Sequence, residues 1–188
     1  MSRGRLLVAL GILFGHSTLA LGQAIQPVQQ LPRIPTVATD TLPDLARAVA
    51  DPDRPVIYYN PRLMARFGPE ISAFVLAHEL AHIALGHARP SPGRALTETE
   101  KGELERLLRS WELEADCVAA IRLSRERPAA LSAAIQFFEQ MGESRIDAEH
   151  PTGAARAERL NSCGRSWVGG PLLRGEAPHP RFRGLRFR

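Results

Sequence analysis

The segment HELAHIALGH, residues 78–87, brings two histidines and a glutamate into a spacing that suits metal chemistry. His78 and His82 are four residues apart, so on a helix they project from one face and can share one zinc ion. Glu79 would then lie beside a water on that ion and act as its general base. The alternative is an amphipathic helix with two histidines facing a polar cleft. The apolar neighbours on both sides favour the metal site, because buried histidines and acids need a compensating ion.

A third protein ligand must come from elsewhere, and the spacing of His87 disfavours it as that ligand. In the metzincin pattern a glycine and a third histidine follow the first histidine by seven and ten residues, whereas Gly86 and His87 follow His78 by eight and nine. His87 is also five residues past His82, which rotates it away from the shared face. We expect His87 to cap the helix end or to face solvent.

The acidic segment ELEAD supplies the missing ligand. Glu112 and Asp116 are four residues apart and share a helix face, whereas Glu114 points nearly the opposite way. Glu112 can complete a three-ligand site, and Asp116 can accept the spare ring N–H of a bound histidine and fix its tautomer. The alternative, a solvated acidic patch, is disfavoured by the apolar residues around these acids.

Three blocks of this sequence, HELAHIALGH, ELEAD and HPTGAARAERL, resemble the signature blocks of zinc metallopeptidase family 48 of clan MA. These gluzincins include HtpX-like, BepA-like, Oma-type and CaaX prenyl proteases. The resemblance covers about residues 54–160. It implies an α+β, mostly helical gluzincin fold with a small edge strand or sheet beside the active-site helix. It also implies one Zn²⁺ per chain on His78, His82 and Glu112, with Glu79 as the catalytic base and Asp116 behind the ligands.

The third block adds two residues to the implied site. His150 precedes Pro151, and Arg156 follows six residues after His150, as in the family's pattern. His150 would face the metal, where it stabilises the oxyanion or gates access, and Arg156 would support the site. From the residues alone, His150 could equally cap the short helix that follows. Thr152 stands where the family has a second proline, and the membrane helices and repeat domain of some members are missing.

Helices must position these side chains. The sequence predicts one helix over residues 68–87, with Pro69 in its first turn. A second runs from the capping box of Thr97 and Glu100 to about Arg125, a third spans residues 128–141, and a fourth begins near Thr152. Residues 41–51 have helical apolar spacing and predict a short helix. Residues 54–61, RPVIYYNP, predict a strand at an edge or in a very small sheet. An extended substrate could pair with this strand, although it could equally be an ordinary structural strand.

The N-terminal residues read as a secretory signal peptide over residues 1–22. Arg3 and Arg5 precede an apolar run and then small residues, and cleavage is expected before Gln23 or, as second choice, before Ile25. An uncleaved anchor is disfavoured, because ten apolar residues are too few for about 30 Å of hydrocarbon. We expect an extended lead over residues 23–39, a zinc metallopeptidase domain over 40–165 and a basic, disordered tail over 166–188. The mature chain is expected to be exported, periplasmic or extracellular, with no integral membrane segment.

Charge and cysteine content narrow the function classes. The formal net charge is +4, and most of the basic surplus lies in residues 174–188. No basic face with interleaved aromatic residues is visible, so no nucleic-acid partner is expected. Cys117 and Cys163 can form one disulfide after export, or remain two buried thiols.

The sequence predicts an endopeptidase acting on extended or misfolded envelope polypeptides. The alternative is a non-proteolytic or latent zinc-binding chaperone or assembly factor.

Overall fold

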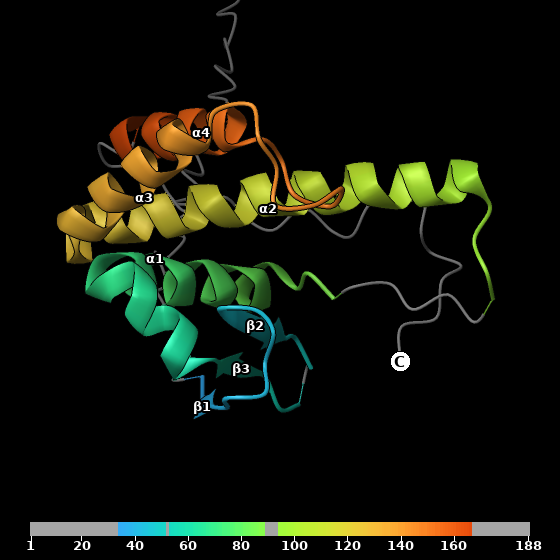
Figure 1. The fold of residues 1–188 in the computed structure, drawn as a ribbon, viewed down its shortest axis with the longest axis horizontal. Helices are drawn as coiled ribbons and strands as arrows, with labels where there is room; N and C mark the ends of the chain where they lie inside the picture. Colours follow the sequence, from blue (N-terminus) through green and yellow to red (C-terminus); the bar gives the residue numbers. More distant parts are fainter. Residues whose placement is uncertain (1–33, 52, 89–93, 167–188) are drawn as a thin grey trace, which may run out of the picture. The chain divides into compact units, whose positions relative to one another are not determined.

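The computed structural model describes residues 34–51, 53–88 and 94–166 (Figure 1). The predicted signal peptide, most of the predicted lead and the predicted tail beyond Ser166 lie outside the described residues. Among the described helices, none combines the length and the apolarity needed to span a membrane.

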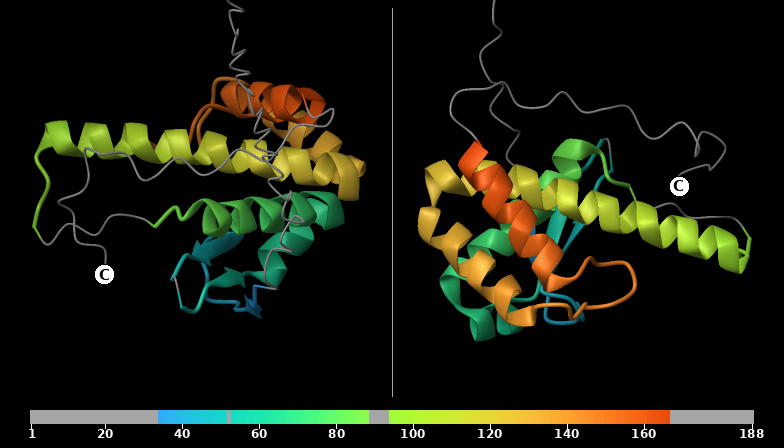
Figure 2. Two further views of the ribbon diagram at one scale, coloured as in Figure 1. Left: turned by 180° about the vertical axis from the view of Figure 1, so that it is seen from behind. Right: turned by 90° about the horizontal axis from the view of Figure 1, so that it is seen from above.

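A small sheet followed by helices makes up the described part of the chain, which confirms the predicted α+β, mostly helical class. Figures 1 and 2 show α1 between the sheet and α2, and α4 on the far side of α2, whose N-terminal half extends past the other helices. α3 packs against α1, α2 and α4. The strands are β1 (Thr36–Ala38), β2 (Ala46–Val49) and β3 (Val56–Tyr59), and the helices are α1 (Pro61–Leu85), α2 (Glu98–Glu126), α3 (Pro128–Met141) and α4 (Gly153–Ser166).

The sheet has the order β1-β3-β2, so the predicted strand, β3, lies in its centre. β1 pairs with β3 in parallel, with Val37 opposite Tyr58, and β2 pairs with β3 antiparallel, with Ala48 opposite Ile57. The prediction of a very small sheet is confirmed, but the prediction of an edge position for this strand is wrong. The flanking prolines allow a central position because the ladder occupies only the residues between them. A substrate therefore cannot pair with β3.

The segment predicted as a short helix, residues 41–51, instead contains β2, and that prediction is wrong. Apolar spacing in so short a segment gives little helical stability in isolation, because the free-energy cost of nucleating a helix exceeds the free energy gained from the hydrogen bonds of a few residues. Tertiary contacts decide the conformation here. Ala46 of β2 is buried in a cluster with Ile57 of β3 and Met64 of α1, and the Ala48 amide donates to the side chain of Glu79 on α1. β2 is the sheet edge beside that helix.

Helix α1 has two parts. Asn60 caps its start by accepting from the amides of Arg62 and Leu63, and Gly68, at φ 81° and ψ 174°, kinks it before Pro69. The predicted helix corresponds to the part after the kink. Gly86 ends it in the left-handed region, where glycine is favoured.

The remaining helix boundaries follow the predicted signals. Thr97 and Glu100 form both hydrogen bonds of the capping box at the start of α2. Pro128 opens α3, and Gly142 ends it with a positive φ.

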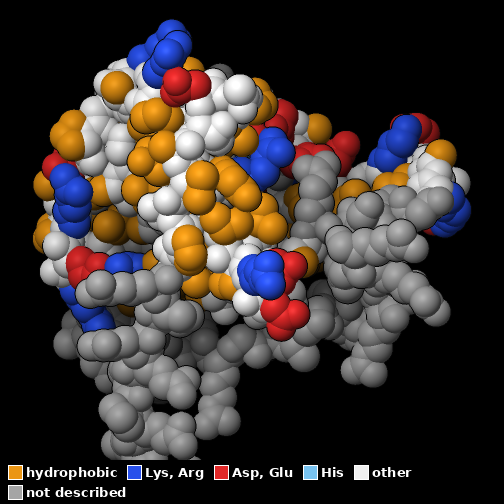
Figure 3. Space-filling model, turned by 90° about the horizontal axis from the view of Figure 1, so that it is seen from below, with side chains coloured by type: hydrophobic (Ala, Val, Ile, Leu, Met, Phe, Trp, Pro, Cys, Tyr) orange, Lys and Arg blue, Asp and Glu red, His pale blue; other side chains and the backbone are white. Residues whose placement is uncertain are grey.

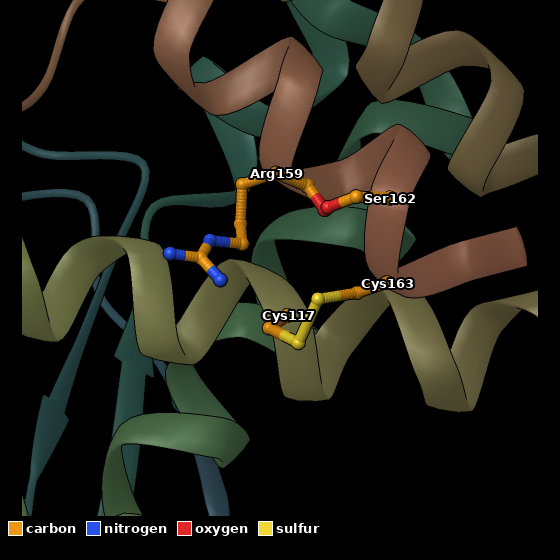
Figure 4. Close-up of a disulfide and its surroundings, with 4 residues drawn as sticks. All are labelled: Cys117, Arg159, Ser162 and Cys163. Atoms are coloured by element: carbon orange, nitrogen blue, oxygen red, sulfur yellow. A yellow bond between two sulfur atoms is a disulfide. The ribbon is translucent and has the colours of Figure 1, made fainter. Parts of the chain in front are cut away.

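One apolar core lies between the helices and includes Phe74, Leu123, Phe138 and Leu160. Beside it a disulfide between Cys117 and Cys163 joins α2 to α4 (Figure 4). The sequence left this pairing open, and the structure resolves it in favour of the disulfide. The two helices that carry Glu112 and Arg156 are thereby linked covalently.

Apolar side chains gather on the face shown in Figure 3, below the sheet in the view of Figure 1. The large exposed hydrophobic residues of the strands are Val37, Val49 and Tyr58. Val37 and Tyr58 are paired neighbours, so one face of the sheet packs on α1 while the other exposes these apolar side chains together with Arg47, which pairs with Tyr58 from β2.

Candidate metal centre

Three side chains from two helices bring one donor atom each to the same point. His78 Nε2 lies 3.0 Å from His82 Nε2 and 3.1 Å from Glu112 Oε2. His82 Nε2 lies 3.3 Å from Glu112 Oε1. The two histidines lie four residues apart on one face of α1. The carboxylate belongs to α2, which packs alongside α1. Among the described residues these three are recognised as a group that can hold a metal ion.

The spacing of these donors fits a zinc ion. Nitrogen and oxygen ligands at about 2.0–2.1 Å in a tetrahedron are separated from one another by about 3.3 Å. The three observed separations are close to that value. Two imidazoles and one carboxylate also match the ligand set of catalytic zinc sites that keep a fourth position open. The residues present therefore fit the ion that the sequence predicts.

A buried ion pair stands behind His78. Its Nδ1 lies 2.9 Å from Asp116 Oδ1. Asp116 is fully buried and accepts two hydrogen bonds from Arg156, through Nη2 at 2.7 Å and Nε at 2.8 Å. The guanidinium of Arg156 also lies 4.1 Å from the ring centre of Phe138. Asp116 thus orients the His78 ring, and Arg156 compensates the charge of Asp116.

The pKa values show an environment that favours a positive charge at the donor cluster. Burial on its own would lower the pKa of His78, but hydrogen bonds to Asp116 and Glu112 outweigh it and raise that pKa to about 10. Burial would raise the pKa of Glu112, but hydrogen bonds from His78 and His82 lower it. The pKa of Asp116 is lowered against burial, mainly by Arg156. In the metal-free protein a proton on His78 supplies the charge that a metal ion would bring.

Glu79 lies in the cleft beside the donors and is tied to the sheet. Its Oε2 accepts a 2.6 Å hydrogen bond from the amide of Ala48 on β2. The cleft is lined by Glu79, His82, Glu112, His150 and the β2 residues Ala46, Arg47 and Ala48. Leu108 and Trp111 of α2 also contribute to its wall. A carboxylate that is not one of the three donors therefore faces the same cleft as His82, Glu112 and an edge strand.

His150 reaches the same cleft from the segment before α4. Its Nε2 lies 3.7 Å from Glu112 Oε2, and its Nδ1 lies 2.8 Å from Asp147 Oδ1. Asp147 also accepts from the amides of Glu149 and His150, so a local turn holds the ring. Arg109 of α2 donates to the carbonyl of Ala148 and attaches this turn to α2. His150 is 29% exposed at its side chain, so a bound substrate can contact it.

The solvent exposure of His87 differs from what the sequence predicts. Its side chain is only 5% exposed, so the expectation that it faces solvent is wrong. The ring stacks on Trp111 with centres 4.9 Å apart and planes 6° apart. Its Nδ1 lies 3.1 Å from His82 Nδ1, and its Nε2 lies 3.3 Å from Glu114 Oε2. Burial, followed by the nearby His82, lowers the pKa of His87 to about 3, so the ring is neutral.

All the predicted site residues therefore lie in one region of the described structure. His78, His82 and Glu112 form the donor cluster, and Asp116 and Arg156 lie behind it. Glu79 and His150 face the cleft. Sequence reasoning missed the contacts of His87 with His82 and Glu114. The only signal available was the position of His87 directly after the glycine that ends the helix, where the chain reverses.

Residues 36–116 match a protein-family model described as "Putative metallopeptidase domain". The match covers less than half of the chain and supports a metallopeptidase-like family. It includes the sheet, α1 and α2 as far as Asp116, whereas His150 and Arg156 lie beyond it. The comparisons with curated proteins and with solved structures found no match for this chain.

Proposed function

We propose that this protein is a zinc-dependent endopeptidase of the family 48 type, acting on extended or misfolded polypeptides of the cell envelope. The observation that carries this proposal is the convergence of His78, His82 and Glu112 within 3.3 Å of one another, with Glu79 in the same cleft. A site that only stabilises the fold has no use for a general base and usually closes with a fourth side chain.

Glu79 acts as the proton carrier of the reaction. When bound, a zinc ion polarises the scissile carbonyl and lowers the pKa of a water molecule. Glu79 accepts a proton from the attacking water and delivers it to the leaving nitrogen as the carbon–nitrogen bond breaks. The short hydrogen bond from Ala48 holds the Glu79 carboxylate at the edge strand, next to the position of an extended substrate.

β2 is the strand along which we place the substrate. It is a sheet edge, and its residues Ala46–Ala48 line the cleft beside Glu79. Main-chain pairing along an edge strand gives affinity with little dependence on sequence, which suits unfolded polypeptides. The disulfide between Cys117 and Cys163 favours an oxidising compartment and so supports export, periplasmic or extracellular, as part of the proposal.

His150 is assigned to the oxyanion. Asp147 holds the Nδ1 side of the ring, so Nε2 is directed to the cleft near Glu112. A donor at this position stabilises the tetrahedral oxyanion, and removing such a donor costs about 10²–10³-fold in kcat. The same proximity favours one second candidate, a latent protease in which His150 closes the fourth position. Replacing His150 with alanine separates the two, since it lowers kcat in the first case and raises it in the second.

Cleavage of an unfolded protein tests the proposed function. The full mature chain, loaded with Zn²⁺, is incubated with reduced, unfolded casein, and new amino termini are identified by mass spectrometry. We expect internal cleavage that 1,10-phenanthroline abolishes and added Zn²⁺ restores. A zinc-loaded protein that binds the unfolded chain but leaves it intact, both as wild type and as His150→Ala, would contradict the proposal.

A further inference from the structure

The two histidines of the donor cluster are supported in different ways at the nitrogen that faces away from it. His78 places Nδ1 2.9 Å from the carboxylate of Asp116. His82 places Nδ1 3.1 Å from a second imidazole, that of His87. His87 is separate from the donor cluster, because it meets His82 at the nitrogen opposite to the one in the cluster. The contact at this nitrogen allows His87 to act on the donor cluster through His82.

The direction of each proton follows from the position of His82. To bind a cation through Nε2, His82 must carry its proton on Nδ1. His82 Nδ1–H then donates, so the Nδ1 of His87 must accept. A neutral His87 that accepts at Nδ1 has its proton on Nε2, which lies 3.3 Å from Glu114 Oε2. One arrangement of protons satisfies both contacts, and it leaves the His82 Nε2 lone pair directed at the donor cluster.

The structure also fixes the plane of the His87 ring. The ring lies flat against Trp111, one residue before Glu112, with 6° between their planes. Gly86 turns the chain in the left-handed conformation, and the His87 amide donates to the carbonyl of His82 at 3.0 Å. The His87 side chain thus folds back onto its own helix and lies between His82 and Trp111, where it is 5% exposed.

We propose that His87 is a positioning residue for the metal site, which accepts the Nδ1 proton of His82 and fixes its tautomer and orientation. Glu114 holds the far side of the His87 ring. This pair does for His82 what Asp116 and Arg156 do for His78. The inference rests on the metal site of the proposed function but is independent of peptide hydrolysis, because it concerns affinity for the metal alone.

Two substitutions separate hydrogen bonding from packing. His87→Phe keeps an aromatic ring against Trp111 but has no acceptor for His82. His87→Gln loses the stacked ring but offers a carbonyl oxygen as acceptor. Loss of the partner behind a histidine ligand weakens metal binding by about 10–100-fold. We therefore expect weaker binding in His87→Phe, and affinity within about threefold of wild type in His87→Gln.

The measurement is a Zn²⁺ titration of the metal-free full mature chain against a chromophoric chelator, with the absorption spectrum of the Co²⁺-loaded protein as a second readout. We expect His87→Phe to shift the Co²⁺ bands, because the ligand field of His82 changes, while its thermal unfolding stays close to that of wild type. His87→Phe with wild-type Zn²⁺ affinity and an unchanged Co²⁺ spectrum would overturn the inference and leave the protease proposal standing. A protein that binds Zn²⁺ tightly but cleaves nothing, both as wild type and as His150→Ala, overturns the protease proposal only, and a wild type that binds no Zn²⁺ overturns both.

Discussion

At the residue scale, His78 links the protonation of the protein to its affinity for metal. Asp116 and Glu112 raise its pKa to about 10 in the metal-free protein, so near neutral pH a metal ion must displace a proton. Because the raised pKa favours the protonated form below pH 10, lowering the pH strengthens the competitor of the metal. We therefore expect a proton and a divalent ion to compete for the donor cluster.

We expect the dissociation constant for Zn²⁺ to rise by about tenfold for each unit by which the pH falls between 8 and 6, as displacement of one proton requires. Competition titrations in weakly coordinating buffers measure this slope. An affinity that does not change over this range would contradict the proton competition that we assign to His78.

Arg156 allows a second prediction at this scale. It is 5% exposed and makes two hydrogen bonds to the fully buried Asp116. Arg156→Met removes both of these hydrogen bonds and the positive charge that compensates the buried carboxylate, which costs about 3–5 kcal/mol in the free energy of unfolding. Arg159→Met on the exposed face of the same helix is the matched control, with an expected change below about 0.5 kcal/mol. Denaturant unfolding of the metal-free proteins measures both, and equal stabilities for the two variants would refute the assignment.

At the element scale, the packing of the start of α4 against the end of α3 requires the backbone at Gly153 to approach α3 closely. A Cβ on Gly153 would lie 2.5 Å from both Met141 Cβ and Phe138 O, so α4 could not keep its place. A displaced α4 would carry Arg156 away from Asp116.

Gly153→Ala is therefore expected to lower the free energy of unfolding by about 1–3 kcal/mol. Gly102→Ala in α2 is the control, because its Cβ would meet only the tip of Arg106 at 3.9 Å. That substitution should stabilise the helix by up to about 1 kcal/mol. Urea denaturation of both variants provides the comparison, and the prediction fails if Gly153→Ala is as stable as wild type.

The disulfide between α2 and α4 gives a further prediction at this scale. It closes a loop with a sequence separation of 46 between Cys117 and Cys163. Chain entropy in the unfolded state makes such a link worth about 4 kcal/mol. The variant with both cysteines changed to alanine should lose stability of that order, measured beside oxidised and reduced wild type. Equal stability of the oxidised wild type and the double variant would show that the link does not stabilise the fold.

The elements that the sequence predicted well are those with local signals. The capping box of Thr97 and Glu100, the glycines at 86 and 142 and the prolines at 69 and 128 all act within one helical turn. β2 was missed because its conformation depends on β3 and on Glu79 of α1, which are distant in sequence. His87 was missed for the same reason, since its partners Trp111 and Glu114 belong to another helix. The donor set could be predicted because helical spacing alone aligns His78 with His82.

At the scale of the whole molecule, the site joins every layer of the described fold. The sheet provides the edge strand, α1 provides two donors and Glu79, and α2 provides the third donor. α4 contributes Arg156, and the segment before it contributes His150. The match to a metallopeptidase domain ends at Asp116, so the contributions of His150 and Arg156 rest on this structure and on the resemblance of their sequence block.

The central claim is that Glu79 performs chemistry at a metal held by other residues. The most direct test measures metal content and casein cleavage together in wild type and Glu79→Gln. We predict that Glu79→Gln binds one Zn²⁺ per chain, as wild type does, and cleaves about 10²–10⁴-fold more slowly, because the donors remain while the proton carrier is lost. A zinc-loaded Glu79→Gln variant that cleaves casein at the wild-type rate would contradict the claim.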